Sequence, residues 1–467
     1  MATAGASDGF APNRTPFKPL IAAADGSNFT YASLHDRVPH ILTDVVNDLF
    51  AAVERCTGSA GATAEGKALT GELSRLKHEM VTNKPLTPIE DDGAEDIAVW
   101  NGWLAAYFPG ATWYSAPFLA WEPYMYRRIA ALFRRSQHWA GHDFFAARKE
   151  ATFRASMAAV AKLCARTEAL AAQTAGDAAG PALRQVAFAE LLQASLWGNQ
   201  TDLSMFPDLT SDALEAMQAR ILSGANSAKI VVNDTDRVWQ IVSRIKRGRI
   251  DIVLDNAGFE LLQDVLLAHW LVAAGIAAKV VFHPKRVPWY VSDVTTRDFH
   301  WLVDAVRDPS LAGAAGPLPP ADAAALGRLG ARWAELLADG TWELRDELFW
   351  TGPYGYRYLP TEGRDAWEGA LLKADVVLFK GDLNYRKLVY DLEWPVSTPF
   401  ADALGPLSGA DAPAIVAVRT AKCDTIVGVD AARAAALFAQ QKDWVCSGQY
   451  GVIQLSPGRW AVQEDAE

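Results

Sequence analysis

The chain has 467 residues, of which 50% are hydrophobic, 21% charged and 10% aromatic. This composition predicts a globular protein with a large core and excludes a disordered, collagen-like or coiled-coil chain. At roughly 150 residues per domain, the length allows about two or three domains. The formal net charge of −11 argues against a nucleic-acid-binding protein, which needs a basic face for phosphates. A local basic pocket for a small anion is still compatible with it.

The first half of the chain is predicted to be mainly helical, with no internal repeat. Apolar residues recur at helical spacing over residues 45–53, 98–107, 124–133, 153–170 and 186–196. Segments rich in proline or glycine, at residues 57–62, 109–117 and 175–181, separate these patterns.

The second half alternates short β-branched runs with helical patterns. Strands are predicted at residues 250–254, 278–282, 376–379, 414–418 and 450–455, and helices at 259–274 and 301–306. Such alternation predicts a parallel sheet covered on both faces. We therefore divide the chain into a helical N-terminal portion, residues 1–225, and an α/β portion, residues 226–467. Two independent domains and one body with a helical cap both fit this division.

Targeting and redox signals favour a cytoplasmic protein. No uncharged apolar run of about 18 residues is present, and the N-terminus lacks the pattern of a secretory signal. The four cysteines form no CxxC pair, which argues against a zinc knuckle or a disulfide framework. We expect neither a membrane nor a nucleic acid as a partner.

Polar residues follow four of the predicted strands, where an open parallel sheet binds its ligands. These residues are Asp255-Asn256, His283-Pro284-Lys285, the stretch from Lys380 to Arg386, and the stretch from Arg419 to Lys422. We expect them to share one edge of the sheet.

Asp255 and Asn256 offer two hard oxygen donors, which suit Mg²⁺ or Mn²⁺. Gly258 relieves the turn, and the helix that begins near Phe259 directs its N-terminal amides toward an anion. The competing interpretation is that Asp255 or Asn256 only caps that helix. Asp293 is a candidate third ligand, although its Ser-Asp context also fits an ordinary turn or helix cap.

Basic residues near the same edge are candidate anion contacts. Arg419 and Lys422 can neutralise a phosphate. Lys380 begins a stretch whose glycine lets the backbone approach a ligand, but the stretch lacks the Walker spacing. A solvated loop and helix start is its alternative interpretation.

The helical half offers further candidates, namely Glu122, Arg127 and Asn199. They either contribute to a pocket from a cap or form buried polar networks between helices. Competing chemistries lack their motifs. No GxGxxG follows a strand, and the one GxSxG match, residues 5–9, follows no strand.

Taken together, these motifs resemble the metal-dependent damage-control phosphatase family, in particular the subgroup marked by an Arg-Thr-x-Lys motif. That motif is residues 419–422 here, and the resemblance extends to residues 122–128 and 196–203 of the helical half. It implies a Rossmann-like three-layer α/β/α sandwich with a mainly helical N-terminal portion. The one departure is Ala257, which is often serine in the family.

The resemblance also implies roles for individual residues. Asp255, Asn256 and Asp293 match the divalent metal ligands, and Lys422 matches the substrate lysine. Mn²⁺ is the metal we name first, with Ni²⁺, Co²⁺ and Mg²⁺ as alternatives. Glu260 matches a position assigned to S-adenosylmethionine. The substrate-binding set is Asp255, Asn256, Lys380, Asp382, Leu383, Asn384, Tyr385 and Lys422.

The expected activity is metal-dependent hydrolysis of a small sugar phosphate, such as fructose 1-phosphate or fructose 6-phosphate. The nucleophile is either metal-activated water or a carboxylate, Asp255 or Asp293. Two alternatives are an S-adenosylmethionine-dependent protein-glutamate O-methyltransferase, a role described for animal members of the subgroup, and a non-catalytic sugar-phosphate binder. Against methyl transfer, no glycine-rich loop follows the first predicted strand, and that reaction needs no divalent metal.

Overall fold

The computed structural model describes residues 21–463, apart from residues 23–25, 27, 57, 176–179, 199–226 and 312–317. Within the described residues, one seven-stranded sheet has the order β1-β7-β6-β5-β2-β3-β4. Its strands are β1 (Ile230–Asn233), β2 (Gly248–Val253), β3 (Ala277–His283), β4 (Trp342–Leu344), β5 (Val376–Lys380), β6 (Ala414–Thr420) and β7 (Gly451–Ser456).

All five predicted strands are present, but the last one runs in the opposite direction to its neighbour. The five strands from β6 to β4 are parallel, whereas β7 is antiparallel to β6 and β1 is parallel to β7. The expectation of a wholly parallel sheet was therefore wrong at this end. A strand buried on both faces has the same continuous apolar pattern in either direction, so its sequence does not report its direction.

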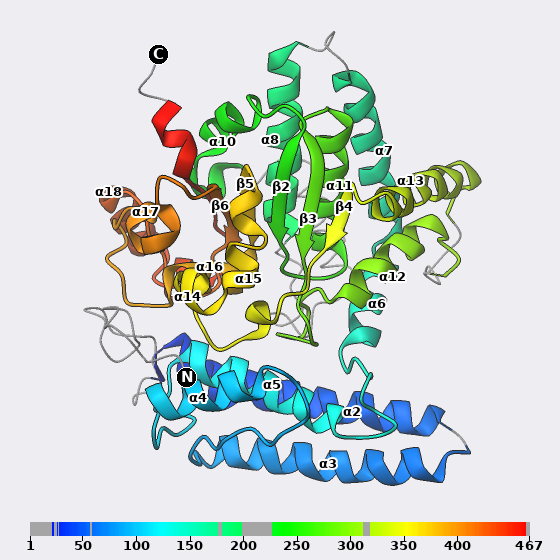
Figure 1. Ribbon diagram of the computed structural model, residues 1–467, viewed down its shortest axis with the longest axis vertical. Helices are drawn as coiled ribbons and strands as arrows, with labels where there is room; N and C mark the ends of the chain where they lie inside the picture. Colours follow the sequence, from blue (N-terminus) through cyan, green and yellow to red (C-terminus); the bar gives the residue numbers. More distant parts are fainter. Residues whose placement is uncertain are drawn as a thin grey trace.

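Helices cover both faces of the sheet, which confirms the predicted three-layer arrangement (Figure 1). One face packs against α7 (Met157–Thr174), α8 (Pro181–Gly198), α10 (Thr235–Val242), α11 (Phe259–Ala273), α12 (Thr296–Arg307) and α13 (Pro320–Ala338). The other packs against α14 (Leu359–Glu362), α15 (Arg364–Trp367), α16 (Gly381–Val389), α17 (Phe400–Leu404) and α18 (Ala431–Gln440). In β5, Val376 and Leu378 face the first layer, and Val377 and Phe379 face the second.

A separate group of helices lies across the carboxyl edge of the sheet (Figure 1). It comprises α1 (Phe29–Ala32), a π-helical turn (Ser33–Arg37), α2 (Val38–Arg55), α3 (Ala60–Val81), α4 (Ile97–Tyr107) and α5 (Phe118–Arg134). We call residues 29–134 the helical body and the rest, from α6 (Ala146–Ala155) onward, the α/β body. The core of the helical body takes in Trp289, Tyr290 and Val291 after β3, and Leu383 after β5. Its packing therefore reaches the strand ends where polar residues were predicted to gather.

The helices of the predicted N-terminal portion belong to two different cores. Helices α7 and α8 pack on the sheet layer rather than in the helical body. The predicted division near residue 225 adjoins residues 199–226, outside the described residues, and stays a prediction. The sequence patterns missed α3, whose three glycines weaken its helical signal, and the short strands β1 and β4. The pattern at residues 153–170 spans two helices that meet at Ser156.

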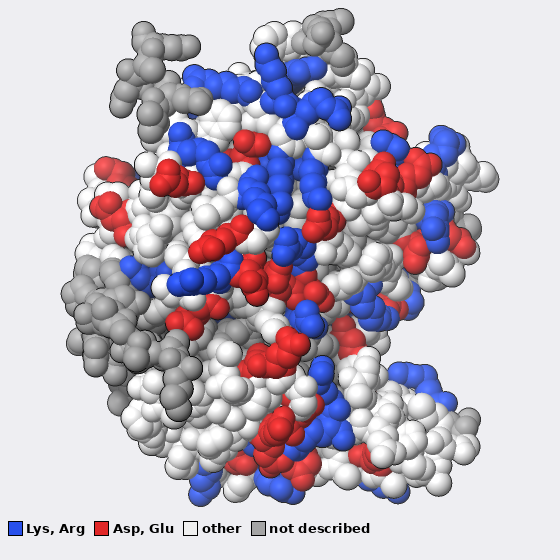
Figure 2. Space-filling view, in the orientation of Figure 1, with Lys and Arg blue, Asp and Glu red and all other residues white. Residues whose placement is uncertain are grey.

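No helix among the described residues is long and apolar enough to span a bilayer. On the face seen in Figure 2, acidic and basic side chains are interspersed over both bodies. The charges that decide the binding of a small anion are therefore those inside a pocket.

Candidate active site

A pocket lies between the helical body and the strand ends. It brings together six of the residues predicted for the site, from the segments that follow β2, β3, β5 and β6. Its lining is Phe29, Arg37, Phe118, Asp255, Asn256, Tyr290, Asp293, Asp382, Leu383, Arg386 and Lys422.

Asp255 and Asn256 stand at the end of β2, and neither caps the helix that follows. The N-cap of α11 is Gly258, with φ of 74° and no side-chain cap hydrogen bond. Asn256 Nδ2 instead donates to Asp255 Oδ2 and to Glu260 Oε2, both at 2.8 Å, and its Oδ1 accepts from Ser292 Oγ at 2.6 Å. The capping interpretation is thereby removed, and both side chains line the pocket.

The Asp293 segment pairs with the Asp255 segment through its backbone. Asn256 and Asp293 form an antiparallel bridge, and the backbone N–H of Val294 donates to the carbonyl of Asp255 at 2.8 Å. The cap of α12 is Thr295, within a capping box closed by Asp298, so Asp293 is not a cap either. Main-chain hydrogen bonds thus hold the three candidate metal ligands side by side.

The loop that carries Asp293 is strained. Tyr290 and Val291 have φ of 42° and 68°, a left-handed conformation that a β-branched residue rarely adopts. The ring of Tyr126, from the helical body, packs on the ring of Tyr290 with centroids 4.9 Å apart. Strain of this kind gathers at functional sites and persists where the surroundings enforce it.

A second contact holds the same loop from the sheet side. Lys285, buried after β3, places its Nζ 3.6 Å from Asp293 Oδ2 and donates to the carbonyl of Leu254 at 2.9 Å. The lysine therefore joins the end of β2 to the Asp293 loop.

The donor set of Asp255, Asn256 and Asp293 fits a hard divalent cation. All three residues are at most 4% exposed, and carboxylate and amide oxygens are the ligands that Mg²⁺ and Mn²⁺ prefer. Asn256 Oδ1 accepts from Ser292, whereas Nδ2 lies against Asp255 and Glu260, so ligation by the amide oxygen would require the side chain to turn and give up its hydrogen bonds to both carboxylates. Among the described residues, no group of three or more His, Cys, Asp or Glu side chains is placed to hold a metal. A cation held by Asp255 and Asp293 would therefore need the amide and non-protein ligands to complete its coordination.

Gly381, at the start of α16, allows a close approach to Asp255. It has φ of +82°, and a Cβ added there would lie 1.7 Å from Asp255 Oδ2. The neighbouring Asp382 accepts from Arg419 Nε at 2.8 Å and from the backbone N–H of Lys422 at 3.2 Å. Asp382 thereby connects the turn after β5 to the motif after β6 and places Lys422 at the pocket.

Three predicted substrate contacts lie behind the pocket wall, where they support it. Asn384 Nδ2 donates to the carbonyls of Leu254 and Lys380, at 3.0 and 2.7 Å. The hydroxyl of Tyr385 accepts from the backbone N–H of Val427 at 3.1 Å, and its ring lies under the guanidinium of Arg419. Lys380, Asn384 and Tyr385 are not part of the pocket lining, so a direct substrate contact for them stays a prediction.

Lys380 belongs to a buried acidic cluster beneath Asn256. Its Nζ lies 3.2 Å from Glu260 Oε1 and 3.1 Å from Asp264 Oδ1. Burial opposes the charged form, yet the two carboxylates raise the pKa of Lys380 above its ordinary value. Burial also raises the pKa of Asp264 to about 6, against the attraction of Lys380. The oxygens of Glu260 accept from Lys380 and Asn256, which makes Glu260 a support for the candidate metal ligand.

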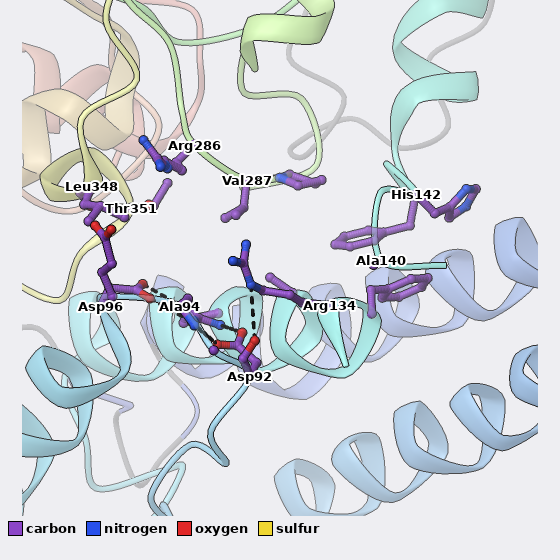
Figure 3. Close-up of a pocket in the computed structure, with 17 residues that line it drawn as sticks. Asp92, Ala94, Asp96, Arg134, Ala140, His142, Arg286, Val287, Leu348 and Thr351 are labelled. Carbon is purple, nitrogen blue, oxygen red and sulfur yellow. Dashed lines mark hydrogen bonds and ion pairs between the residues drawn. The ribbon is translucent and has the colours of Figure 1, made fainter. Parts of the chain in front are cut away.

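Of the three candidates from the helical half, Glu122 contacts a residue of this pocket and Arg127 does not. Glu122 is fully buried and accepts from Arg37, which lines the pocket. Arg127 pairs with Asp92 and Asp96. All three line a second pocket, which none of the candidate metal ligands lines. Figure 3 shows this pocket with Asp92 and Asp96 labelled. Arg127 thus acts as part of a polar network between helices, the alternative left open above. Asn199 lies outside the described residues.

Sequence reasoning missed five pocket residues. They are Phe29, Arg37, Phe118, Tyr290 and Arg386. Arg386 ends the stretch that follows the predicted strand 376–379, and Tyr290 lies three residues before Asp293, so proximity to Asp382 and Asp293 was an available signal. The three from the helical body follow no strand. Their one signal was Glu122, the single acid of this helix, because a buried carboxylate needs a cationic partner.

The fold and the site define a class: an α/β protein whose oxygen-rich, lysine-bearing pocket lies at the carboxyl edge of an open sheet. The family model for the damage-control phosphatase ARMT1-like domain matches residues 33–437. The mouse protein named damage-control phosphatase ARMT1 is 35% identical over 456 residues, covering 93% of this chain and 98% of that protein. Its human namesake is 33% identical over 453 residues, covering 93% and 97%.

The chain therefore belongs to the damage-control phosphatase ARMT1-like family, which confirms the resemblance and the expectation of an enzyme. This family is metal-dependent in general. A crystal structure of a DUF89 family protein from Pyrococcus horikoshii is 15% identical with a TM-score of 0.40, covering 89% of this chain and 98% of that one.

Proposed function

We propose that this protein hydrolyses the phosphate ester of a small sugar phosphate, such as fructose 1-phosphate or fructose 6-phosphate, with the help of a divalent metal. We name Mn²⁺ as that metal and the cytoplasm as the location. The observation that carries the proposal is the single pocket lined by Asp255, Asn256, Asp293 and Lys422. Family membership supports the phosphatase chemistry.

The charges around the pocket favour a dianionic ligand only when a divalent cation is bound. Three ion pairs are internally neutral: Asp382 with Arg419, Arg386 with Asp391 and Arg37 with Glu122. The carboxylates of Asp255 and Asp293 are then matched by the ammonium groups of Lys422 and Lys285. Beneath Asn256, Lys380 faces two carboxylates, those of Glu260 and Asp264. A divalent cation would add two positive charges to these surroundings and so favour a phosphate monoester dianion.

Phosphoryl transfer depends on positioning and on neutralising charge that spreads over the phosphoryl oxygens. Bound to Asp255, Asn256 and Asp293, a divalent cation would supply that charge and lower the pKa of a water molecule. Lys422 would donate to another phosphoryl oxygen, held in place by the hydrogen bond from its backbone N–H to Asp382. Water and the carboxylate of Asp255 or Asp293 are the two candidate nucleophiles, and trapping of an aspartyl-phosphate distinguishes them.

The test is phosphate release from a panel of sugar phosphates with Mn²⁺, Co²⁺, Ni²⁺ or Mg²⁺, with chelator as the control. We expect release with at least one metal and loss of release with chelator. Release that is unchanged by the chelator would contradict the metal assignment.

The same preparation tests both alternatives. Binding of S-adenosylmethionine in calorimetry would favour methyl transfer, and sugar-phosphate binding without phosphate release would indicate a non-catalytic binder.

A further inference from the structure

One wall of the pocket comes from the helical body, through Phe29, Arg37 and Phe118. Arg37 is the last residue of the π-helical turn Ser33–Arg37, which joins α1 to α2. Such turns are rare and occur frequently at functional sites. The side chain of Arg37 is 14% exposed, so the guanidinium lies within the wall rather than in solvent.

The guanidinium of Arg37 is held from one side only. Its NH2 donates to both oxygens of Glu122, at 2.7 and 2.6 Å, and Glu122 is fully buried. The Nε of Arg37 is buried without a hydrogen-bond partner among the described residues. An unpaired buried N–H is costly. Glu122 fixes the orientation of the guanidinium, and Nε is closed off from the pocket. The terminal nitrogen that Glu122 does not use is therefore the donor available to a ligand in the pocket.

The chemistry of this wall suits the alcohol part of the ester rather than its phosphate. Glu122 already neutralises the charge of Arg37, whereas the phosphate is expected at Lys422 and the candidate metal ligands. The rings of Phe29 and Phe118 line the same wall. The guanidinium of Arg386 lies over the ring of Phe118, 3.6 Å from its centroid, which fixes that ring. Apolar walls with a few placed donors are how proteins orient small ligands.

We infer that Arg37 is a specificity-determining residue, which donates hydrogen bonds to a hydroxyl group of the sugar moiety while the α/β body holds the phosphate. The inference rests on the proposed function. It makes Glu122 a positioning residue that acts through Arg37. It also means that the helical body, rather than the strand ends, selects among phosphate esters.

The experiment compares two ligands of the full-length, metal-loaded protein. One is the sugar phosphate with the highest turnover in the panel, and the other is inorganic phosphate, which has no sugar, measured as a competitive inhibitor. R37Q is expected to raise the KM for the sugar phosphate about 10- to 100-fold. The reason is that the variant lacks the donor of the hydrogen bond to the sugar hydroxyl, so the substrate binds more weakly. The inhibition constant of inorganic phosphate should stay within about twofold of the wild-type value.

The matched control is R128Q. Like Arg37, Arg128 belongs to the helical body and pairs with a glutamate. It lies in α5, its partner is Glu79 at 2.6 Å, and neither residue lines the pocket. We expect this variant to keep the wild-type KM for the sugar phosphate and the wild-type inhibition constant of inorganic phosphate. R37K retains a cation for Glu122 but lacks the second terminal nitrogen of the guanidinium. It should therefore reproduce the effect of R37Q, and it decides the matter if R37Q does not fold.

Each remaining outcome contradicts a different claim. An equal weakening of sugar-phosphate and inorganic-phosphate binding would make Arg37 a phosphate contact. Unchanged constants in both Arg37 variants would show that Arg37 has no role in binding. Either result overturns this inference but not the proposed function. A wild-type protein that releases phosphate from no ester would overturn the proposed function and the inference together.

Discussion

The two walls of the pocket are held in place by different means. On the α/β side, backbone hydrogen bonds between the segments of Asp255 and Asp293 fix the candidate metal ligands. On the helical side, ring packing such as that of Tyr126 on Tyr290 joins the two bodies. Side-chain contacts change more readily by mutation than a backbone pairing does. The chemistry and the choice of substrate are therefore separable, and substitutions on one wall should leave the work of the other intact.

The largest effect is expected from Asp255→Asn on the α/β wall. Loss of a carboxylate ligand should lower kcat by roughly 10³-fold or more, because charge neutralisation and water activation both depend on the metal. Phosphate release at saturating metal measures it, with a thermal unfolding curve to confirm the fold. Asp304→Asn, at an exposed pair with Arg307 on α12, is the control. Turnover within about tenfold of the wild type would contradict the assignment.

Lys422→Gln is expected to come next. Removing one preorganised cation from the phosphate should lower kcat/KM by roughly 10²-fold while the metal still binds. The kinetics are compared with those of Lys373→Gln, which alters an exposed lysine far from the pocket lining. Equal kinetics in the two variants would exclude Lys422 from substrate binding.

Gly381→Ala tests the close approach of α16 to Asp255. The new Cβ would lie 1.7 Å from Asp255 Oδ2 at φ of +82°, so we expect a loss of about 1–3 kcal/mol in the free energy of unfolding together with most of the activity. Gly340→Ala is the matched control, since Gly340 has φ of +78° with no atom within 4 Å of an added Cβ. It should be destabilised without losing activity. Urea unfolding and phosphate release separate the two, and a fully active Gly381→Ala variant would show that Asp255 tolerates displacement.

The smallest effect concerns Lys387, buried where α16 meets the helical body. Burial, reinforced by the charge of Lys285, lowers the pKa of Lys387 to about 7. Between pH 7 and about 10 the unfolded chain binds a proton that the folded chain does not. This group therefore makes the protein more stable as pH rises through that range, by at most about 1.4 kcal/mol per pH unit. Lys387→Met should lose this rise in urea unfolding at pH 7 and 9, and exposed Lys373→Met should keep it. Identical slopes in both variants would contradict a buried neutral amine.

The sequence predicted the α/β wall because strand ends are marked by composition. Apolar runs that end in Asp255 or Lys380 can be located without coordinates, and parallel strands bring such ends to one edge. It did not predict whether a residue lines the pocket or supports it from behind. Asn384 and Asp382 stand two positions apart in one helix, yet Asp382 lines the pocket and Asn384 binds backbone carbonyls.

A contribution of the helical half to the pocket was one of two interpretations, but the residues that form this wall were not predicted, because side chains on packed helices carry no comparable mark. Arg37 meets Glu122 across 85 positions of sequence, and only tertiary packing determines that pairing. The reversed direction of β7 was likewise not predicted, because it too is determined by tertiary packing. Hydrophobic periodicity reports burial and leaves open which partner and which orientation provide it.

Strand β7 has a consequence for how the enzyme is made. It lies between β1 and β6, and backbone hydrogen bonds join Ala421 to Tyr450 and Gly448 at its entry. The segment next to Lys422 is therefore braced by residues that are synthesised after it. Until they arrive, β1 lacks its neighbour and the outer edge of β6 is exposed to other chains. A nascent chain that already contains Asp255 and Asp293 would thus still lack the support of the Lys422 segment until β7 has formed.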